Sequence, residues 1–213
     1  MESVSTEQET HPLLSYWVRP RSTIRSLLER GVSPFFLYAL IPLFGIVFTL
    51  DQLFYRNDWG DYLPLSTLVG GAFLLGIPIG FLFWLLYSSL FWGIGKLMGG
   101  TGEWGEMRIA VAWASLPFVG KLLIWSWQIL FFQEEMFMSD TPTIDGSTSL
   151  KLVFMLLILC DLILNVWYFL HLGKSVGEVH EFSAWRGGLV IFLSLVILWC
   201  FFYFALNILI FPW

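Results

Sequence analysis

Charged residues are scarce in this sequence: Asp, Glu, Lys and Arg together make up 13% of its 213 residues. A soluble domain carries about 25%, so the sequence holds too little charge to cover a soluble globular surface. The formal net charge of −5 argues against nucleic-acid binding, which requires a basic face. Two cysteines and three scattered histidines are too few to indicate a disulfide framework or a metal centre.

Apolar residues, by contrast, are abundant, at 57% of the sequence before its 19 glycines are counted. A soluble chain of this length could not bury that share, because its surface is too large relative to its core. A membrane-spanning helix needs about 20 largely apolar residues. We therefore predict an all-α polytopic integral membrane protein, a bundle of five transmembrane helices preceded by a short interfacial amphipathic helix. The expected spans lie at about residues 33–50, 66–95, 109–132, 151–171 and 187–211, within a membrane domain covering residues 32–213.

The second apolar run is ambiguous because it continues without charge from residue 62 to residue 95. It could form one tilted helix or two short spans broken at Gly76–Pro78, but two full spans and a turn need more than about 40 residues. Five spans place eight Lys and Arg residues on one side and two on the other, whereas splitting the second run places five on each side. Since a Lys/Arg excess marks the cytoplasmic side, we predict five spans with a cytoplasmic N-terminus and an outer C-terminus. In this topology Asp51 falls in an acidic outer loop.

The region before the first span is expected to contain a disordered acidic tail, residues 1–15, and a cytoplasmic helix, residues 16–31. The apolar stripe of this helix comprises Ile24, Leu27 and Leu28. Its basic part comprises Arg19, Pro20, Arg21 and Arg25. A short basic amphipathic helix beside a membrane lies in the interface, with its cations near anionic headgroups. The alternative is that the helix docks on protein.

Two predicted cytoplasmic loops contain residue types that bind ligands in other proteins. The glycine-rich segment Gly99–Gly105 lacks the GxxxxGK[ST] spacing of a phosphate-binding loop. The other loop contains His171, Glu178, His180 and Glu181. These residues show no HExxH spacing, and no Ser/His/Asp or Cys/His set stands at catalytic spacing. We therefore predict no catalytic residue, no cofactor and no metal site, and a protein that is not an enzyme.

Two charged residues stand inside predicted spans, Lys121 in the third and Asp161 in the fourth. Lone charges within a membrane face the helix bundle and seek a partner, so we predict that they form an ion pair. Asn165 lies one helical turn from Asp161 on the same face and is expected to hydrogen bond to it. Pro117, one turn before Lys121, frees a backbone carbonyl that we expect to be a further polar contact. The pair would act as a clasp between helices or as a proton or ion relay.

Gly76 and Gly80 form a GxxxG pattern within the second apolar run. This pattern permits close helix contact and therefore self-association. Pro78 between the two glycines indicates a kink equally well.

A Trp-x-x-Pro stretch at residues 17–20 leads into Thr23-Ile24 before the first span. A Gly-Gly-x-Gly loop follows the second span at residues 99–102, and Ala-Trp-Ala-Ser-Leu-Pro occupies residues 112–117. In these motifs the sequence from about residue 15 onward resembles the Yip-domain (Ypt/Rab-interacting protein) membrane family, and it is closer to the prokaryotic members. The family's five spans, cytoplasmic N-terminus and short outer C-terminus match the topology deduced from charge.

The resemblance implies a membrane context rather than a reaction. Eukaryotic Yip proteins bind Rab/Ypt GTPases and act in vesicle budding and Golgi organisation. Their Asp-Leu-Tyr-Gly-Pro signature is absent here, which puts small-GTPase binding in doubt. The resemblance therefore implies a multi-pass protein of the cell (inner) membrane of a prokaryote.

Two functions follow from these observations. The first is a non-enzymatic integral membrane protein that acts by contact with lipids or other membrane proteins, in membrane organisation or a trafficking-like role. The alternative is a small transporter or channel subunit that uses Lys121 and Asp161 together with kinked helices at Pro78 and Pro117, since discontinuous helices line transport sites.

Overall fold

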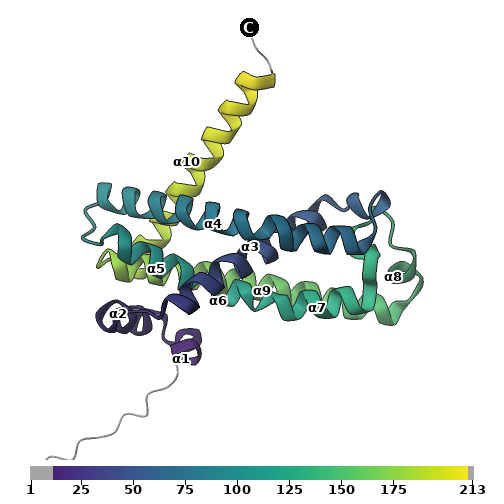
Figure 1. Cartoon of the computed structure of the whole chain (residues 1–213), viewed down its shortest axis with the longest axis horizontal. Coiled ribbons are helices and arrows are strands. Elements are labelled where there is room, and N and C mark those ends of the chain that lie inside the picture. Colours follow the sequence, from purple (N-terminus) through teal and green to yellow (C-terminus); the bar gives the residue numbers. More distant parts are fainter. Residues whose placement is uncertain (1–11, 211–213) are drawn as a thin grey trace, which may run out of the picture.

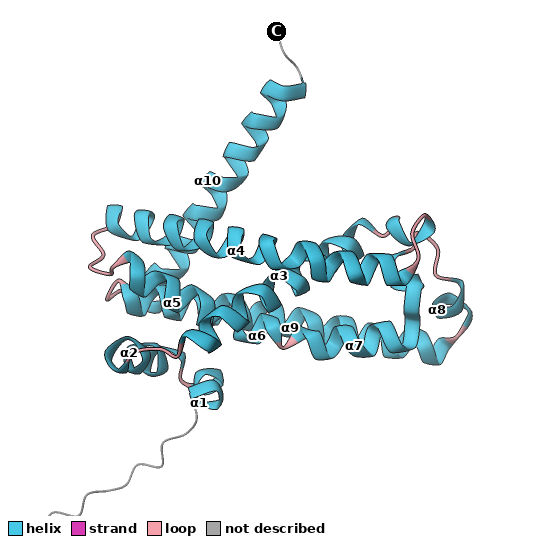
Figure 2. Cartoon of the chain, in the orientation of Figure 1, coloured by secondary structure: helices cyan, strands magenta, loops and turns pink. Residues whose placement is uncertain are grey.

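The computed structural model describes residues 12–210, with side chains up to residue 204, and this part of the chain is helical without strands (Figures 1 and 2). Its elements in chain order are α1 (Pro12–Val18), α2 (Pro20–Arg30), α3 (Pro34–Arg56), η1 (Trp59–Asp61), α4 (Leu65–Leu97), α5 (Trp104–Ala114), α6 (Leu116–Val119), α7 (Lys121–Phe132), η2 (Gln133–Phe137), α8 (Pro142–Gly146), α9 (Thr148–Val179) and α10 (Ala184–Ile210). Five segments of the described chain are long and apolar enough to cross a membrane: Pro34–Arg56, Leu65–Leu97, Trp104–Phe137, Thr148–Val179 and Ala184–Phe204. The predicted all-α, five-span architecture is confirmed.

The N-terminal boundary differs from the expected one. Residues 1–11 of the expected tail lie outside the described residues. Helix α1 begins at Pro12, and proline is well suited to the first turn of a helix. Burial of Tyr16, whose hydroxyl lies 2.8 Å from the Ser175 hydroxyl of α9, holds this helix on the bundle. The expected disorder therefore does not extend over residues 12–15.

Helices α3 and α4 lie side by side because glycines remove the side chains where the two backbones meet (Figure 1). A Cβ added at Gly45 would lie 1.9 Å from the carbonyl oxygen of Gly76, and one added at Gly80 would lie 2.3 Å from that of Ile41. Both glycines of the GxxxG pattern are thus buried against α3 of the same chain. This corrects the expectation that Gly76 and Gly80 provide a surface for self-association.

Helix α4 runs without a break through Pro78. Its 33 residues extend for about 50 Å at 1.5 Å per residue. This length exceeds the membrane's hydrocarbon core, which is about 30 Å thick. The second apolar run therefore forms one long helix, the arrangement that the Lys/Arg distribution favoured.

The third span is divided into α5, α6 and α7 at Ser115 and Gly120. At the first break both the hydroxyl and the backbone nitrogen of Ser115 donate to the carbonyl oxygen of Ala112, over 2.6 Å and 3.2 Å. Pro117 follows at the start of α6, where a helix needs no backbone donor. The breaks allow α7 to begin at Lys121, inside the bundle.

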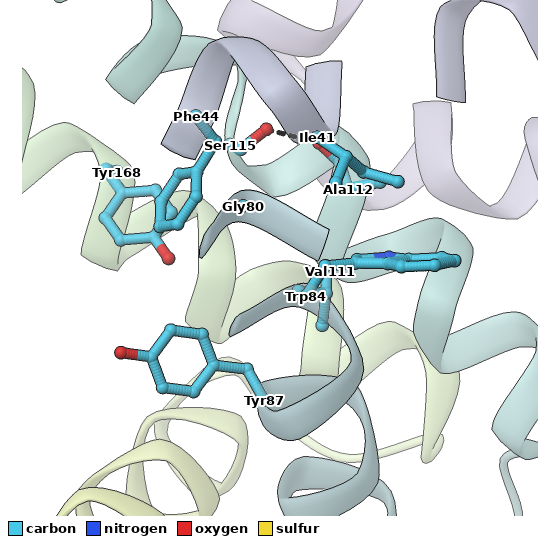
Figure 3. A pocket seen from close by; sticks show the side chains of 9 residues that line it. All are labelled: Ile41, Phe44, Gly80, Trp84, Tyr87, Val111, Ala112, Ser115 and Tyr168. Carbon is cyan, nitrogen blue, oxygen red and sulfur yellow. Dashed lines mark hydrogen bonds between the residues drawn. The ribbon is translucent and has the colours of Figure 1, made fainter. Parts of the chain in front are cut away.

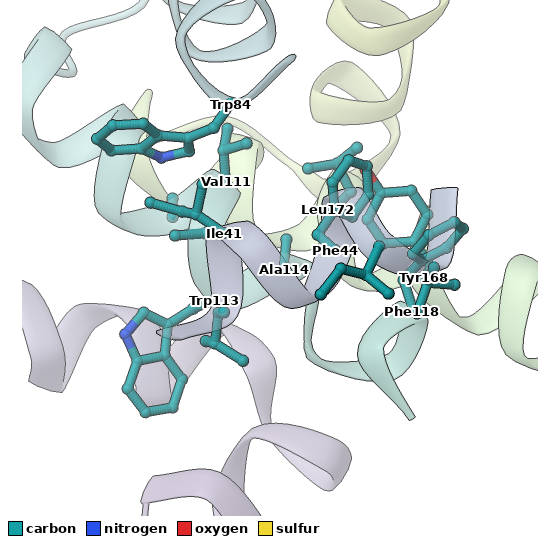
Figure 4. Packing of buried hydrophobic residues seen from close by; sticks show 14 of the residues in the cluster. Ile41, Phe44, Trp84, Val111, Trp113, Ala114, Phe118, Tyr168 and Leu172 are labelled. Atoms are coloured by element: carbon teal, nitrogen blue, oxygen red, sulfur yellow. The ribbon is translucent and has the colours of Figure 1, made fainter. Parts of the chain in front are cut away.

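The core lies where α3, α4, α5, α6 and α9 meet (Figure 4). Its labelled side chains are Ile41, Phe44, Trp84, Val111, Trp113, Ala114, Phe118, Tyr168 and Leu172.

Helix α9 continues to Val179, well past the expected span end at residue 171. Helix α10 begins against α9, where a Cβ at Gly187 would lie 2.1 Å from the carbonyl oxygen of Gly173. Figure 1 shows the C-terminal half of α10 extending away from the bundle.

Candidate functional site

Lys121 is the centre of a buried polar cluster that joins three helices. Its side chain is fully buried, at 0% exposure, at the start of α7. Its Nζ atom donates to Oδ2 of Asp51 on α3 over 2.5 Å. It also lies 2.9 Å from Oδ1 of Asp161 on α9. One ammonium group therefore holds a carboxylate from each of two other helices.

The remaining carboxylate oxygens of this cluster also have hydrogen-bond donors. Trp125 Nε1 donates to Oδ1 of Asp51 over 3.0 Å. Asn165 Nδ2 donates to Oδ2 of Asp161 over 2.9 Å, and the Asn165 Oδ1 atom lies 3.5 Å from Lys121 Nζ. Such pairing is what permits charge within a bilayer, because an isolated ion there is costly. We call these five residues the Lys121 cluster.

The structure brings Lys121, Asp161 and Asn165 together as their spacing predicts, but it adds Asp51. The sequence interpretation ended the first span at residue 50 and placed Asp51 in a loop, whereas α3 continues to Arg56. A charge after an apolar run predicts the end of a span, but the Asp51 carboxylate is paired inside the bundle with Lys121 and Trp125. The relevant signal was the apolar sequence Leu53-Phe54 that follows Asp51. Any functional role of the cluster stays a prediction.

Pro117 is not among the polar partners of Lys121. Those partners are Asp51, Asp161 and Asn165, and the ammonium also lies 4.7 Å from the centroid of the Phe118 ring. The expected contact through a carbonyl freed by Pro117 is thereby corrected. The proline contributes instead by beginning the short helix α6 that precedes Lys121.

The chemistry available to the Lys121 cluster is electrostatic. One ammonium and two carboxylates, when all are ionised, carry a net charge of −1. Within residues 12–204 the cluster pairs no hydroxyl or thiol nucleophile with a base. An arrangement whose polar atoms satisfy one another fits a clasp between helices more directly than acid–base catalysis.

A cleft adjoins the Lys121 cluster and is bounded by α3, α4, α6, α9 and α10. It encloses about 680 Å³, part of it open to the surroundings. Asp51 and Asn165 line one part of it, and Tyr87 and Tyr168 also line it. A smaller pocket of about 260 Å³ lies beside it and shares these two tyrosines (Figure 3). We refer to the larger space as the α4–α10 cleft.

The basic residues of α2 form a second polar site, at the cytoplasmic end predicted from charge. Arg21 Nε donates to Oε2 of Glu178 over 2.7 Å, and Arg25 lies 2.5 Å from Oε1 of the same carboxylate. Ile24 is fully buried in the same interface. The apolar stripe of α2 thus packs on protein, which favours the docking alternative for this helix. Pro20 is also buried, whereas Arg19 is exposed at the junction between α1 and α2.

We predict that Glu178→Gln loosens α2 from the bundle. The amide cannot bind two guanidinium groups as a carboxylate does, and charge-assisted hydrogen bonds are the stronger ones. In an Ile24→Cys reporter background, labelling by a water-soluble maleimide should rise several-fold. Glu181→Gln, at an exposed position three residues away, is the matched control and should leave the labelling rate unchanged. Equal rates in both variants would show that the pairing does not hold α2.

The two described histidines pack against backbone. His171 lies on α9, with Nε2 3.1 Å from the carbonyl oxygen of Tyr16, and His180 Nε2 lies 3.2 Å from that of Phe91. A Cβ at Gly100 would lie 2.4 Å from the His180 ring, so this loop glycine serves close packing. Burial lowers the pKa of His180, and the charge of Lys96 acts in the same direction. No group of three metal-ligating side chains occurs in the described part of the chain.

The Yip1 domain family matches residues 14–207, nearly the whole of the 213-residue chain. The chain belongs to the Yip1 domain family. No curated protein and no solved structure matches it. Membership of the family and the five apolar helices together show a multi-pass helical membrane protein.

Proposed function

We propose that this Yip1-domain protein is a non-enzymatic component of a prokaryotic cell membrane that acts by contact with lipids or other membrane proteins. The observation that carries the proposal is the Lys121 cluster, whose carboxylate oxygens are all engaged within the protein. Carboxylates that are all paired within the protein stabilise the helix bundle, and none of their oxygens is left unpaired for a reaction. The α4–α10 cleft, lined largely by aromatic and aliphatic side chains, supports a lipid-facing role.

The proposed topology places the N-terminus in the cytoplasm and the C-terminus outside. The basic residues Lys96, Arg108, Lys174 and Arg186 lie near the ends of their helices on the side of the bundle that carries α2. A Lys/Arg excess of this kind marks the cytoplasmic face.

A transporter or channel subunit is the alternative function, and two observations favour it. The third span is segmented just before Lys121, and discontinuous helices line transport sites. Asp51 joins the cluster to the α4–α10 cleft. Pro78 gives this alternative less support, because α4 continues through it.

Flux measurements on proteoliposomes separate the two functions. Vesicles containing the purified protein are compared with protein-free vesicles for movement of protons, monovalent cations and fluorescent lipid. We expect equal rates in both. Robust movement in the protein-containing vesicles that is lost in an Asp51→Asn variant would overturn the proposed function in favour of the transporter.

A further inference from the structure

The α4–α10 cleft has an aromatic wall and an opening on the outside of the bundle. Phe48 of α3, Phe118 of α6 and Phe169 of α9 give it an aromatic lining. Phe169 and Leu195 of α10 line the cleft and are also exposed on the outside of the bundle. In a bilayer, such side chains contact acyl chains, so the cleft opens sideways towards lipid.

Two tyrosine hydroxyls lie in this apolar space without a partner. Tyr87 of α4 and Tyr168 of α9 have no hydrogen bond to any described residue. Tyr168 is only 7% exposed, and Figure 3 shows the two rings one above the other on the same side of the smaller pocket. A hydroxyl in hydrocarbon without an acceptor is unfavourable. An occupant of the cleft that accepts hydrogen bonds would remove this cost.

The position of the hydroxyls indicates which part of a lipid they meet. Tyr168 precedes Lys174 by six residues of α9, about 9 Å at 1.5 Å per residue. Tyr87 precedes Lys96 by nine residues of α4, about 14 Å by the same rise. Long lysine side chains near the ends of spans reach the headgroup layer. The hydroxyls therefore lie just below that layer, where the ester groups and upper acyl chains of a phospholipid lie.

We propose that the α4–α10 cleft binds one ester-linked phospholipid, whose ester carbonyl oxygens accept hydrogen bonds from Tyr87 and Tyr168 while an acyl chain lies along the phenylalanine wall. This inference deepens the proposed function and rests on it. The cleft's volume of about 680 Å³ includes space that is open to the surroundings. Several turns of a helix about 10–12 Å in diameter would need more space, so α10 of a second copy is the poorer occupant.

Photolabelling tests the site. The full chain is reconstituted in vesicles of phosphatidylethanolamine and phosphatidylglycerol that contain a phosphatidylcholine with a diazirine in its acyl chain. We expect labelled peptides from residues 44–48 and 168–172. Tyr87→Phe with Tyr168→Phe should lower cleft labelling about fivefold or more when the probe is below saturation, since each hydroxyl contributes one hydrogen bond. Tyr38→Phe, an exposed tyrosine of α3 outside the cleft, should have no effect.

A blocking variant provides an independent readout. Leu195→Trp at the mouth of the cleft should reduce its labelling several-fold, whereas Leu123→Trp on the exposed face of α7 should not. Cleft labelling that is insensitive to both the tyrosine and the Leu195 variants would overturn the proposal. So would preferential labelling by a diazirine fatty acid that lacks esters, or disulfide-linked dimers between Leu195→Cys and Phe169→Cys copies.

Combining the flux measurements with the photolabelling tests the lipid site separately from the proposed function. Vesicles that show cleft labelling together with ion movement would retain the lipid site and overturn the non-transport function. Vesicles that show neither would overturn the lipid site alone.

Discussion

Lys121→Met is expected to cost about 3–5 kcal/mol of stability, the usual cost of breaking a buried ion pair from one side. The ammonium group of Lys121 contacts carboxylates of both Asp51 and Asp161. Without it, two carboxylates from α3 and α9 remain in a low-dielectric space with only Trp125 and Asn165 as donors. The yield of monodisperse protein after heating in detergent, followed by size-exclusion chromatography, measures the loss.

The two acids should behave unlike the lysine. Asp51→Asn leaves Lys121 paired with Asp161, and Asp161→Asn leaves it paired with Asp51. Each single variant also removes the excess negative charge, so each should cost less than about 2 kcal/mol, within the range for one charged hydrogen bond. The double variant Asp51→Asn/Asp161→Asn removes both counter-charges and should cost about as much as Lys121→Met.

Removing all three charges should restore much of the stability. Lys121→Met combined with Asp51→Asn and Asp161→Asn leaves no buried ion, and replacing every member of a buried ionic group is often tolerated. A pairwise replacement of Lys121 and Asp161 alone should rescue less, because Asp51 would remain unpaired. If either single acid variant were as unstable as the double acid variant, the cluster would not share one lysine between two carboxylates.

The sequence was informative about this cluster where charge stood alone, and misleading where charge stood near the end of a span. Lys121 and Asp161 are isolated within apolar runs, so a partner was required and spacing along the helices identified it. Asp51 follows the first apolar run closely, and a charge in that position predicts the start of a loop. Only tertiary packing shows that Lys121 and Trp125 approach it from another helix.

A similar limit applies to the glycines and to α2. Spacing within α4 showed that Gly76 and Gly80 permit close approach, but not that Gly45 of α3 is the opposing residue. The stripe containing Ile24 predicted an amphipathic helix, yet an apolar face has the same pattern whether it meets lipid or protein. The deciding contact is Glu178, 157 residues from Arg21 along the chain. Local patterns specified the elements and their buried faces, and the long-range partners came from the fold.

Gly45→Ala is expected to destabilise the protein strongly. The added Cβ would lie 1.9 Å from the carbonyl oxygen of Gly76 and 2.5 Å from the backbone nitrogen of Gly80. Backbone atoms cannot move aside as a flexible side chain does, so α3 and α4 must separate along their contact. Overpacking costs about 1–3 kcal/mol and sometimes more, and a clash with backbone belongs at the upper end. The same heating and size-exclusion measurement reports the change.

Gly71→Ala is the matched control, because it places the same methyl group on α4 where no atom lies within 4 Å. It should stabilise the protein by about 0.5–1 kcal/mol, since alanine is preferred to glycine within a helix. Gly80→Ala, whose Cβ would lie 2.3 Å from the carbonyl oxygen of Ile41, should resemble Gly45→Ala. Both changes separate the same two helices, so the double variant should cost less than the sum of the single variants. Full additivity, or a Gly45→Ala protein as stable as Gly71→Ala, would show that α3 and α4 do not pack through these glycines.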